Sequence, residues 1–142
     1  MPATMTREEV HAFLDSRPGW IVFTSIGTDG YPHAIPLGYF RLGDNVIVGG
    51  RPGTQKALNV ERNPQVSLTL ESGRQWQELK GVLIQGSAIV HTAAEDLLHF
   101  ARAGAKRRGV DDEDLPKSAP KEAMYIEISP EKIISWDYSR EE

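Results

Sequence analysis

The feature that most constrains the fold is a succession of short apolar stretches separated by turns of hairpin length. In residues 65–71, Val66, Leu68 and Leu70 alternate with polar residues, which is the pattern of a strand with one buried face. Hairpin-length turns join antiparallel neighbours, whereas parallel strands need long crossover connections. The sequence therefore predicts an antiparallel sheet that curls into a barrel, not a doubly wound parallel sheet.

About six or seven strands are expected, because runs rich in β-branched and aromatic residues recur along the chain. Gly86 marks a bulge or a point of close approach in one of them. Pro32 and Pro36 cannot donate ladder hydrogen bonds, so backbone pairing is expected to be interrupted there or turned toward something else. The expected strands are residues 20–26, 31–40, 46–49, 65–71, 81–91, 123–128 and 132–136, with Ser129 and Pro130 between the last two.

One helix is expected before the strands and two between them. The first begins at a capping box formed by Thr6 and Glu9. The second spans residues 54–62, and a further capping box of Thr92 and Glu95 is expected to open the third. The chain is thus predicted to be mainly β, with minor α content.

Length and composition limit the classes of protein to which this chain can belong. The 142 residues suit one domain over 1–142, and 39% hydrophobic with 25% charged residues is typical of a soluble globular protein. No apolar run is long enough to cross a bilayer, and the N-terminal residues lack the apolar core of a signal peptide. We therefore expect a cytoplasmic protein with no membrane partner. A net charge of -4 argues against nucleic acid as a partner.

Side-chain chemistry excludes several kinds of site. Without cysteine there is no disulfide, thiol nucleophile or thiolate metal site. The four histidines have no metal-ligand spacing, so no metal site is expected. No pair of carboxylates suggests acid–base catalysis, and the catalytic residues remain unidentified.

The junction between the third expected strand and the second helix is a candidate phosphate site. Two glycines end the strand, and Arg51, Thr54 and Lys56 follow within one helical turn of the junction. Helix N-termini bind anions through free N–H groups and the positive end of the helix dipole. The spacing matches neither a Walker loop nor the dinucleotide fingerprint. An ordinary loop with solvated charges is the alternative.

Three segments in order resemble the pyridoxamine 5′-phosphate oxidase-like split β-barrel family, whose members bind flavin or deazaflavin. Residues 24–36 read Thr-Ser-Ile-Gly-Thr-Asp-Gly-Tyr-Pro-His-Ala-Ile-Pro. Residues 56–66 read Lys-Ala-Leu-Asn-Val-Glu-Arg-Asn-Pro-Gln-Val. Residues 78–88 read Glu-Leu-Lys-Gly-Val-Leu-Ile-Gln-Gly-Ser-Ala. The resemblance rests on the order and spacing of these segments together.

The resemblance implies an antiparallel split β-barrel that forms a homodimer with two equivalent cofactor sites across the interface. The cofactor would be FMN, or alternatively F420. Its phosphate would lie at the junction described above, held by Arg51, Thr54 and Lys56. The backbone expected to border the flavin ring belongs to His33, Ala34, Ile35, Pro36 and Leu37 and to Val48, Gly49 and Gly50.

For several single residues the sequence allows two interpretations each. Trp76 either stacks on the ring or caps the core, and Gln85 either reaches the cofactor from the second subunit or faces solvent. His33 is either a proton donor to substrate or a surface residue. Arg140 either contacts the phosphate or lies in a disordered tail. Trp136 and Tyr138 either cover the pocket or are buried by packing or a dimer interface.

The first functional hypothesis is an FMN-dependent oxidoreductase that transfers a hydride to or from a small organic substrate. In such an enzyme the cofactor performs the redox step, which explains why no catalytic triad is needed. The alternatives are an F420-dependent reductase on the same fold and a non-enzymatic flavin- or haem-binding protein. True pyridoxamine phosphate oxidase activity is not expected, because no basic C-terminal segment for a substrate phosphate is found.

Overall fold

The sheet begins and ends with strands that are neighbours along the chain. The computed structural model describes residues 1–141, and its strands follow the order β3-β2-β6-β7-β8-β5-β4, with β1 paired to β8. The strands are β1 (Pro2–Ala3), β2 (Ile21–Ile26), β3 (Pro32–Leu37), β4 (Tyr39–Leu42), β5 (Asn45–Gly50), β6 (Gln65–Ser72), β7 (Lys80–His91) and β8 (Met124–Glu141).

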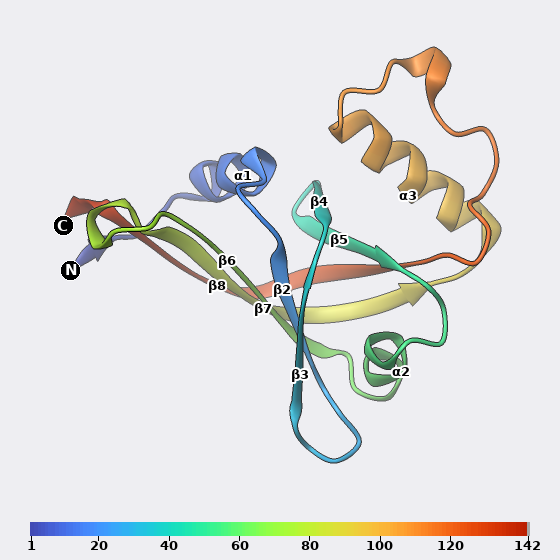
Figure 1. Cartoon of the computed structure of the whole chain (residues 1–142), viewed down its shortest axis with the longest axis horizontal. Helices are drawn as coiled ribbons and strands as arrows, with labels where there is room; N and C mark the ends of the chain where they lie inside the picture. The colour runs from blue at the N-terminus through green and yellow to red at the C-terminus, as the bar shows by residue number, and fades with distance from the viewer. Residues whose placement is uncertain (142) are drawn as a thin grey trace.

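Only Gly38 separates β3 from β4, although the two strands lie at opposite ends of the sheet order. The sheet must therefore curl back on itself, as Figure 1 shows. In the part of the chain that the structure describes, no ladder joins β3 to β4. Every pairing is antiparallel, so the predicted mainly β, antiparallel split barrel is confirmed.

Two strand boundaries were predicted wrongly. The single strand expected over 31–40 is broken at Gly38, where the chain passes from one edge of the sheet to the other. The two strands expected around Pro130 form one continuous strand, β8. Pro130 lies opposite Gly86, where the register shifts, and a Cβ on Gly86 would approach the carbonyl oxygen of Ser129 to 2.3 Å. The bulge predicted at Gly86 therefore lets the ladder continue past a residue that has no N–H.

Helix α1 spans Arg7–Ser16, α2 spans Gln55–Arg62 and α3 spans Ala94–Arg107. Short 3-10 turns, η1 and η2, cover Trp76–Glu78 and Asp112–Asp114. The capping box at Thr6 is confirmed, but the one expected at Thr92 does not form. Ala93 is the N-cap of α3, so Thr92 lies one residue too early to cap it. No helix among residues 1–141 has the length and apolar character needed to cross a membrane.

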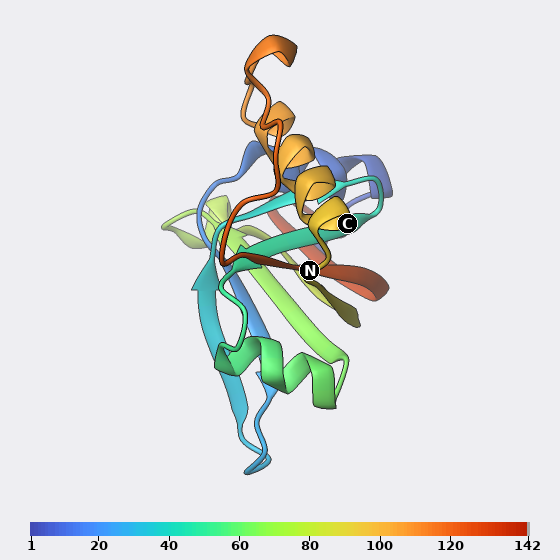
Figure 2. The ribbon, with the colours of Figure 1, turned by 90° about the vertical axis from the view of Figure 1, so that its right-hand side faces the viewer.

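The helices cover different parts of the sheet. In Figure 1, α1 and α3 lie on either side of β4 and β5, while α2 lies at the far end of the barrel. Figure 2 shows α3 toward the top of the molecule and α2 toward the bottom, with the β2–β3 hairpin reaching lower still. Helix α2 contacts β2 and β7, and α1 and α3 both contact β4. The site region described below lies where β5 leads into α2.

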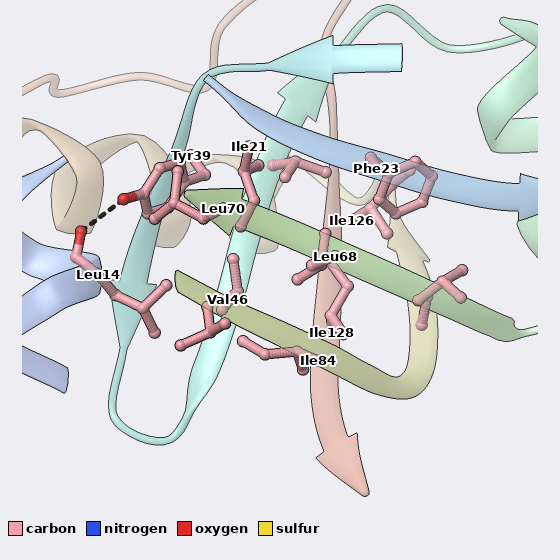
Figure 3. Close-up of a cluster of buried hydrophobic side chains, with 14 of the residues drawn as sticks. Leu14, Ile21, Phe23, Tyr39, Val46, Leu68, Leu70, Ile84, Ile126 and Ile128 are labelled. Atoms are coloured by element: carbon pink, nitrogen blue, oxygen red, sulfur yellow. Dashed lines mark hydrogen bonds between the residues drawn. The ribbon is translucent and has the colours of Figure 1, made fainter. Parts of the chain in front are cut away.

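Inward-facing side chains fill the barrel (Figure 3). Strand β2 alternates between buried and half-buried residues, as expected for a strand with one face in the core. Tyr39 joins α1 to this core, because its hydroxyl donates a 2.6 Å hydrogen bond to the carbonyl of Leu14. Burial raises the pKa of Tyr39 to about 12. The fully buried core side chains include Ile21, Phe23, Val46, Val48, Leu68, Ile84, Ile126 and Ile128.

The end of β8 is fixed to α1 through Asp137, which is only 4% exposed. Its carboxylate accepts hydrogen bonds from the Ser139 hydroxyl at 2.5 Å, the Ser139 N–H at 3.0 Å and Arg140 Nε at 3.0 Å. Arg140 also pairs with Glu9 of α1 at 2.9 Å. These contacts correct the expectation that Arg140 lies in a disordered tail. The hydrogen bonds from Ser139, followed by the contact with Arg140, hold the pKa of Asp137 below its usual range.

We expect Asp137→Asn to lower the free energy of unfolding at pH 7 by about 1.5–3 kcal/mol, the usual range for hydrogen bonds to a charged group. A lowered pKa in the folded state stabilises the fold above about pH 4, and this stabilisation is lost as the pH falls through the folded pKa. The difference between wild type and variant should therefore shrink on acidification. Urea unfolding at pH 7, 5 and 3 measures it.

The matched control is Asp112→Asn, which removes an exposed carboxylate in η2. This control should leave the unfolding free energy nearly unchanged at every pH. A constant difference between wild type and Asp137→Asn from pH 7 to pH 3 would contradict the proposed role of the Asp137 charge.

Candidate functional site

The candidate site is built where β5 ends and α2 begins. Gly50 is the last residue of β5, and Gln55 is the first residue of α2. Between them the chain turns at Gly53, whose φ of 75° is accessible to glycine at little steric cost. Figure 1 shows this loop descending from the end of β5 to α2. The loop brings Arg51, Thr54 and Lys56 to the same end of the barrel.

Lys56 is buried at this junction, with 8% of its surface exposed. Its ammonium group lies beneath Gly50, because a Cβ added to Gly50 would approach Lys56 Nζ to 2.8 Å and Met124 Cε to 3.0 Å. No hydrogen bond or ion pair connects this ammonium to any other residue in the described part of the chain. Lys56 therefore places an uncompensated positive charge under the last residue of β5.

Thr54 is the N-cap of α2 but does not cap it with its side chain. The Thr54 hydroxyl instead donates a 3.1 Å hydrogen bond to the carbonyl of Arg51. The first turn of α2 contains no acidic residue. The N–H groups of this turn and the positive end of the helix dipole are consequently available to an anion. The side chain of Arg51 is exposed beside them.

A buried hydrogen-bond chain fixes α2 on β2. Asn59 is fully buried, its Nδ2 donates to Ser25 Oγ at 3.1 Å, and its Oδ1 accepts from Gln55 Nε2 at 2.7 Å. One turn later, the guanidinium of Arg62 donates to the carbonyl of Ile26. No role for Asn59 was predicted from the sequence. Its spacing of three residues from Lys56, which puts both on one helix face, is the signal that identifies it.

The segment from His33 to Leu37 forms β3, an edge strand of the sheet. Ala34 and Pro36 face outward and are exposed, whereas His33, Ile35 and Leu37 are half-buried. His33 lies directly opposite Ser25, and its Nδ1 is buried without a hydrogen-bond partner in residues 1–141. A buried ring nitrogen without a partner is uncommon.

The end of β3 and the end of β5 lie close together. The β4–β5 ladder pairs Tyr39 with Val48, so the chain leaves Leu37 beside the last residues of β5. Val48 is buried, while a Cβ on Gly49 would meet the ring of Tyr125 at 3.4 Å. The two glycines thus face opposite sides of β5: Gly49 faces Tyr125, and Gly50 faces Lys56. The two backbone segments predicted to border a ring meet at this edge.

Trp76 and Gln85 do not join this cluster within one chain. Trp76 lies in the turn between β6 and β7, at the end of β6 away from α2. It is 71% exposed and its ring centroid is 5.5 Å from that of Tyr138, so the idea that it caps the core is wrong. Gln85 is exposed on β7 and lines a groove of about 370 Å³ together with Ser67 and Lys132.

Trp136 packs on the sheet. Its Nε1 donates a 2.8 Å hydrogen bond to Glu71, and its ring lies against Gly81, where an added Cβ would approach Trp136 to 2.5 Å. Of its two interpretations, packing is therefore the one that the structure supports. Tyr138, its neighbour on the other side of Asp137, remains 38% exposed.

The fold is shared with solved structures. The conserved hypothetical protein Rv2991 from Mycobacterium tuberculosis is 25% identical, with a TM-score of 0.81, and the match covers 94% of this chain and 86% of that protein. An FAD-binding protein from Mesorhizobium loti is 19% identical, with a TM-score of 0.69 and coverage of 95% and 96%. An F420 reductase is 15% identical, with a TM-score of 0.64 and coverage of 86% and 94%. No curated protein matches the chain.

The sequence itself identifies the family. The family model described as pyridoxamine 5′-phosphate oxidase matches residues 6–137, which include the whole β5–α2 junction and most of β8. This agrees with the split-barrel fold and with the ordered segments at 24–36, 56–66 and 78–88. The chain therefore belongs to the pyridoxamine 5′-phosphate oxidase family.

Proposed function

We propose that this protein binds a phosphate-bearing flavin or deazaflavin at the β5–α2 junction and transfers a hydride between that cofactor and a small organic substrate. FMN is the first candidate for the cofactor. The observation that carries the proposal is the ammonium of Lys56, a largely buried side chain, which has no partner among the described residues and lies at the uncapped start of α2.

A cation without a partner at the start of a helix favours an anion there, because its charge adds to the positive end of the helix dipole. A phosphate at the start of α2 would neutralise Lys56 and accept hydrogen bonds from the first-turn N–H groups. Arg51 would add a second cation from the exposed side of the loop. Charge-assisted hydrogen bonds of this kind are stronger than neutral ones. The residues present at the junction therefore fit a phosphate group.

The ring system would lie along the edge where β3 and β5 end. The barrel interior is filled by side chains, so a tricyclic ring must bind outside it. Gly49 and Gly50 carry no side chains of their own at this edge, although Tyr125 and Lys56 occupy the space beside them. A bound flavin would supply the hydride chemistry, and the residues of this chain would hold its phosphate, orient its ring and exclude water.

F420 is the second candidate, because an F420 reductase shares this fold over 86% of the chain. F420 also carries a phosphate, so the same junction would hold it. The absorption spectrum of freshly purified protein, followed by titration with FMN, F420 and haem, tests the proposal. We expect flavin or deazaflavin bands, or saturable binding of one of these two cofactors. A protein that binds only haem would contradict the proposal.

Lys56→Met should weaken binding of FMN or F420 by about 1.5–3 kcal/mol, since it removes a charge-assisted hydrogen bond. Because the ammonium makes no hydrogen bond or ion pair among the described residues and Met keeps most of the buried apolar stem, the thermal stability of the cofactor-free variant should be nearly unchanged. Fluorescence titration and thermal unfolding measure the two effects. The control Lys117→Met removes an exposed lysine and should change neither. If Lys56→Met bound both cofactors with unchanged affinity, the phosphate would have to bind at a site other than the β5–α2 junction.

We further propose that the working unit is a homodimer in which a second copy completes the cofactor site. The support is a row of residues on the outer face of the sheet, formed by register neighbours on consecutive strands. This row, the outer-face row, is largely apolar, and it lies on the side of the sheet that faces away from the barrel core. Its members, from β3 to β8, are Pro36, Val22, Thr69, Leu83 and Ile134.

Sedimentation velocity at micromolar concentration should give a dimer. Leu83→Arg, at the centre of the outer-face row, should give a folded monomer with weakened cofactor binding, because it places a charge in an apolar interface. Ile89→Arg alters an exposed residue of the same strand outside the row and serves as the control. A wild-type monomer that binds cofactor at full strength would contradict the interface.

A further inference from the structure

A cavity of about 710 Å³ lies between the C-terminal ends of α1 and α3, over β4 and β5. Figure 1 shows the two helices on either side of these strands. Arg17 contributes from the end of α1 and Arg108 from the end of α3, and Gly49 forms part of the floor. We call this cavity the α1–α3 pocket. No carboxylate side chain lines it, so its only charged side chains are these two arginines.

Arg17 and Arg108 have no ion pair in the described part of the chain. This distinguishes them from the arginines around them. Asp15, at the end of α1, pairs with Arg41 of β4 at 2.8 Å and with Arg107 of α3 at 3.6 Å. The nearby carboxylate is therefore already neutralised, and it ties the two walls of the pocket together. The guanidinium groups of Arg17 and Arg108 are left to bind a ligand.

The rest of the lining is aromatic or glycine. Trp20, which is 71% exposed, and Tyr125 line the pocket, and Phe40 lies against Gly104, where an added Cβ would approach its ring to 2.9 Å. Burial raises the pKa of Tyr39 and of Tyr125, so both phenols stay neutral at physiological pH. The pocket thus combines positive charge with flat apolar surfaces.

We propose that the α1–α3 pocket is the substrate subsite and that it takes a small organic anion with a flat apolar body, such as an aromatic carboxylate. Arg17 and Arg108 would bind the anionic group, since guanidinium groups match carboxylate geometry, and the aromatic side chains would pack on the body. This inference rests on the proposed function, because the pocket matters for catalysis only if a redox cofactor lies next to it.

Gly49 connects the two sites. It lies in the segment expected to border the cofactor ring and also in the floor of the pocket. Gly38, the residue that follows β3, lines the pocket as well. Lys56 lies on the other side of β5, beneath Gly50, and does not line the pocket. A ligand in the pocket would therefore reach the ring edge without occupying the phosphate site.

The test is calorimetric titration of the purified protein with 2-naphthoate and with its neutral analogue 2-naphthamide. We expect naphthoate to bind at least about tenfold more tightly than naphthamide. Arg17→Gln and Arg108→Gln should each weaken naphthoate binding about tenfold, the effect of losing one charge-assisted hydrogen bond, and leave naphthamide binding unchanged. Arg74→Gln, an exposed arginine in the turn between β6 and β7, is the control and should change neither.

Equal binding of the two probes, no binding of naphthoate, or insensitivity to both arginine substitutions would overturn the proposal. Thermal unfolding of each variant confirms that it is folded. The same titration in Lys56→Met separates this proposal from the proposed function. Naphthoate should bind Lys56→Met as it binds wild type, while affinity for FMN or F420 falls. Arginine-dependent naphthoate binding in a protein that binds neither cofactor would overturn the proposed function and leave the anion subsite standing.

Discussion

The hydrogen bond between the Asn59 amide and the Ser25 hydroxyl is the contact on which the candidate site depends, because it fixes α2 against β2 at full burial. A buried amide that loses its partner costs free energy, so this pairing sets the position of α2. Lys56 lies one turn earlier on the same helix face, and its position beneath Gly50 follows from that placement. The hydrogen bond between Asn59 and Ser25 inside the barrel therefore determines where the Lys56 charge lies, at the rim of the barrel.

The alternation of a β-strand separates the two proposed sites. Gly49 and Gly50 are consecutive, yet one faces Tyr125 and the α1–α3 pocket and the other faces Lys56. A phosphate and a substrate anion would therefore be held on opposite sides of one strand end. Such an arrangement keeps two negative groups apart while both remain next to the same ring.

Local patterns in the sequence were sufficient to predict much of the fold. Alternation predicted strand 65–71, and the helix expected over residues 54–62 is confirmed as α2, which begins one residue later. Features that depend on distant pairing were missed. Pro130 was interpreted as a strand break because its partner Gly86 is far away in the sequence. Likewise, Arg17 and Arg108 belong to different helices, and only the fold brings them to one pocket.

The position of β8 in the sheet has a consequence for how the protein is made. This strand of 18 residues lies between β7 and β5, so among residues 1–141 the ladders connect the β4–β5 hairpin to the rest of the sheet only through it. During synthesis every other strand emerges before β8, and until it arrives the edges of β5 and β7 have no partner. Nascent chains in that state expose strand edges that favour aggregation, and such long-range pairing slows folding. The barrel can therefore close only after β8 has been made, and β5 and β7 each keep an open edge until then.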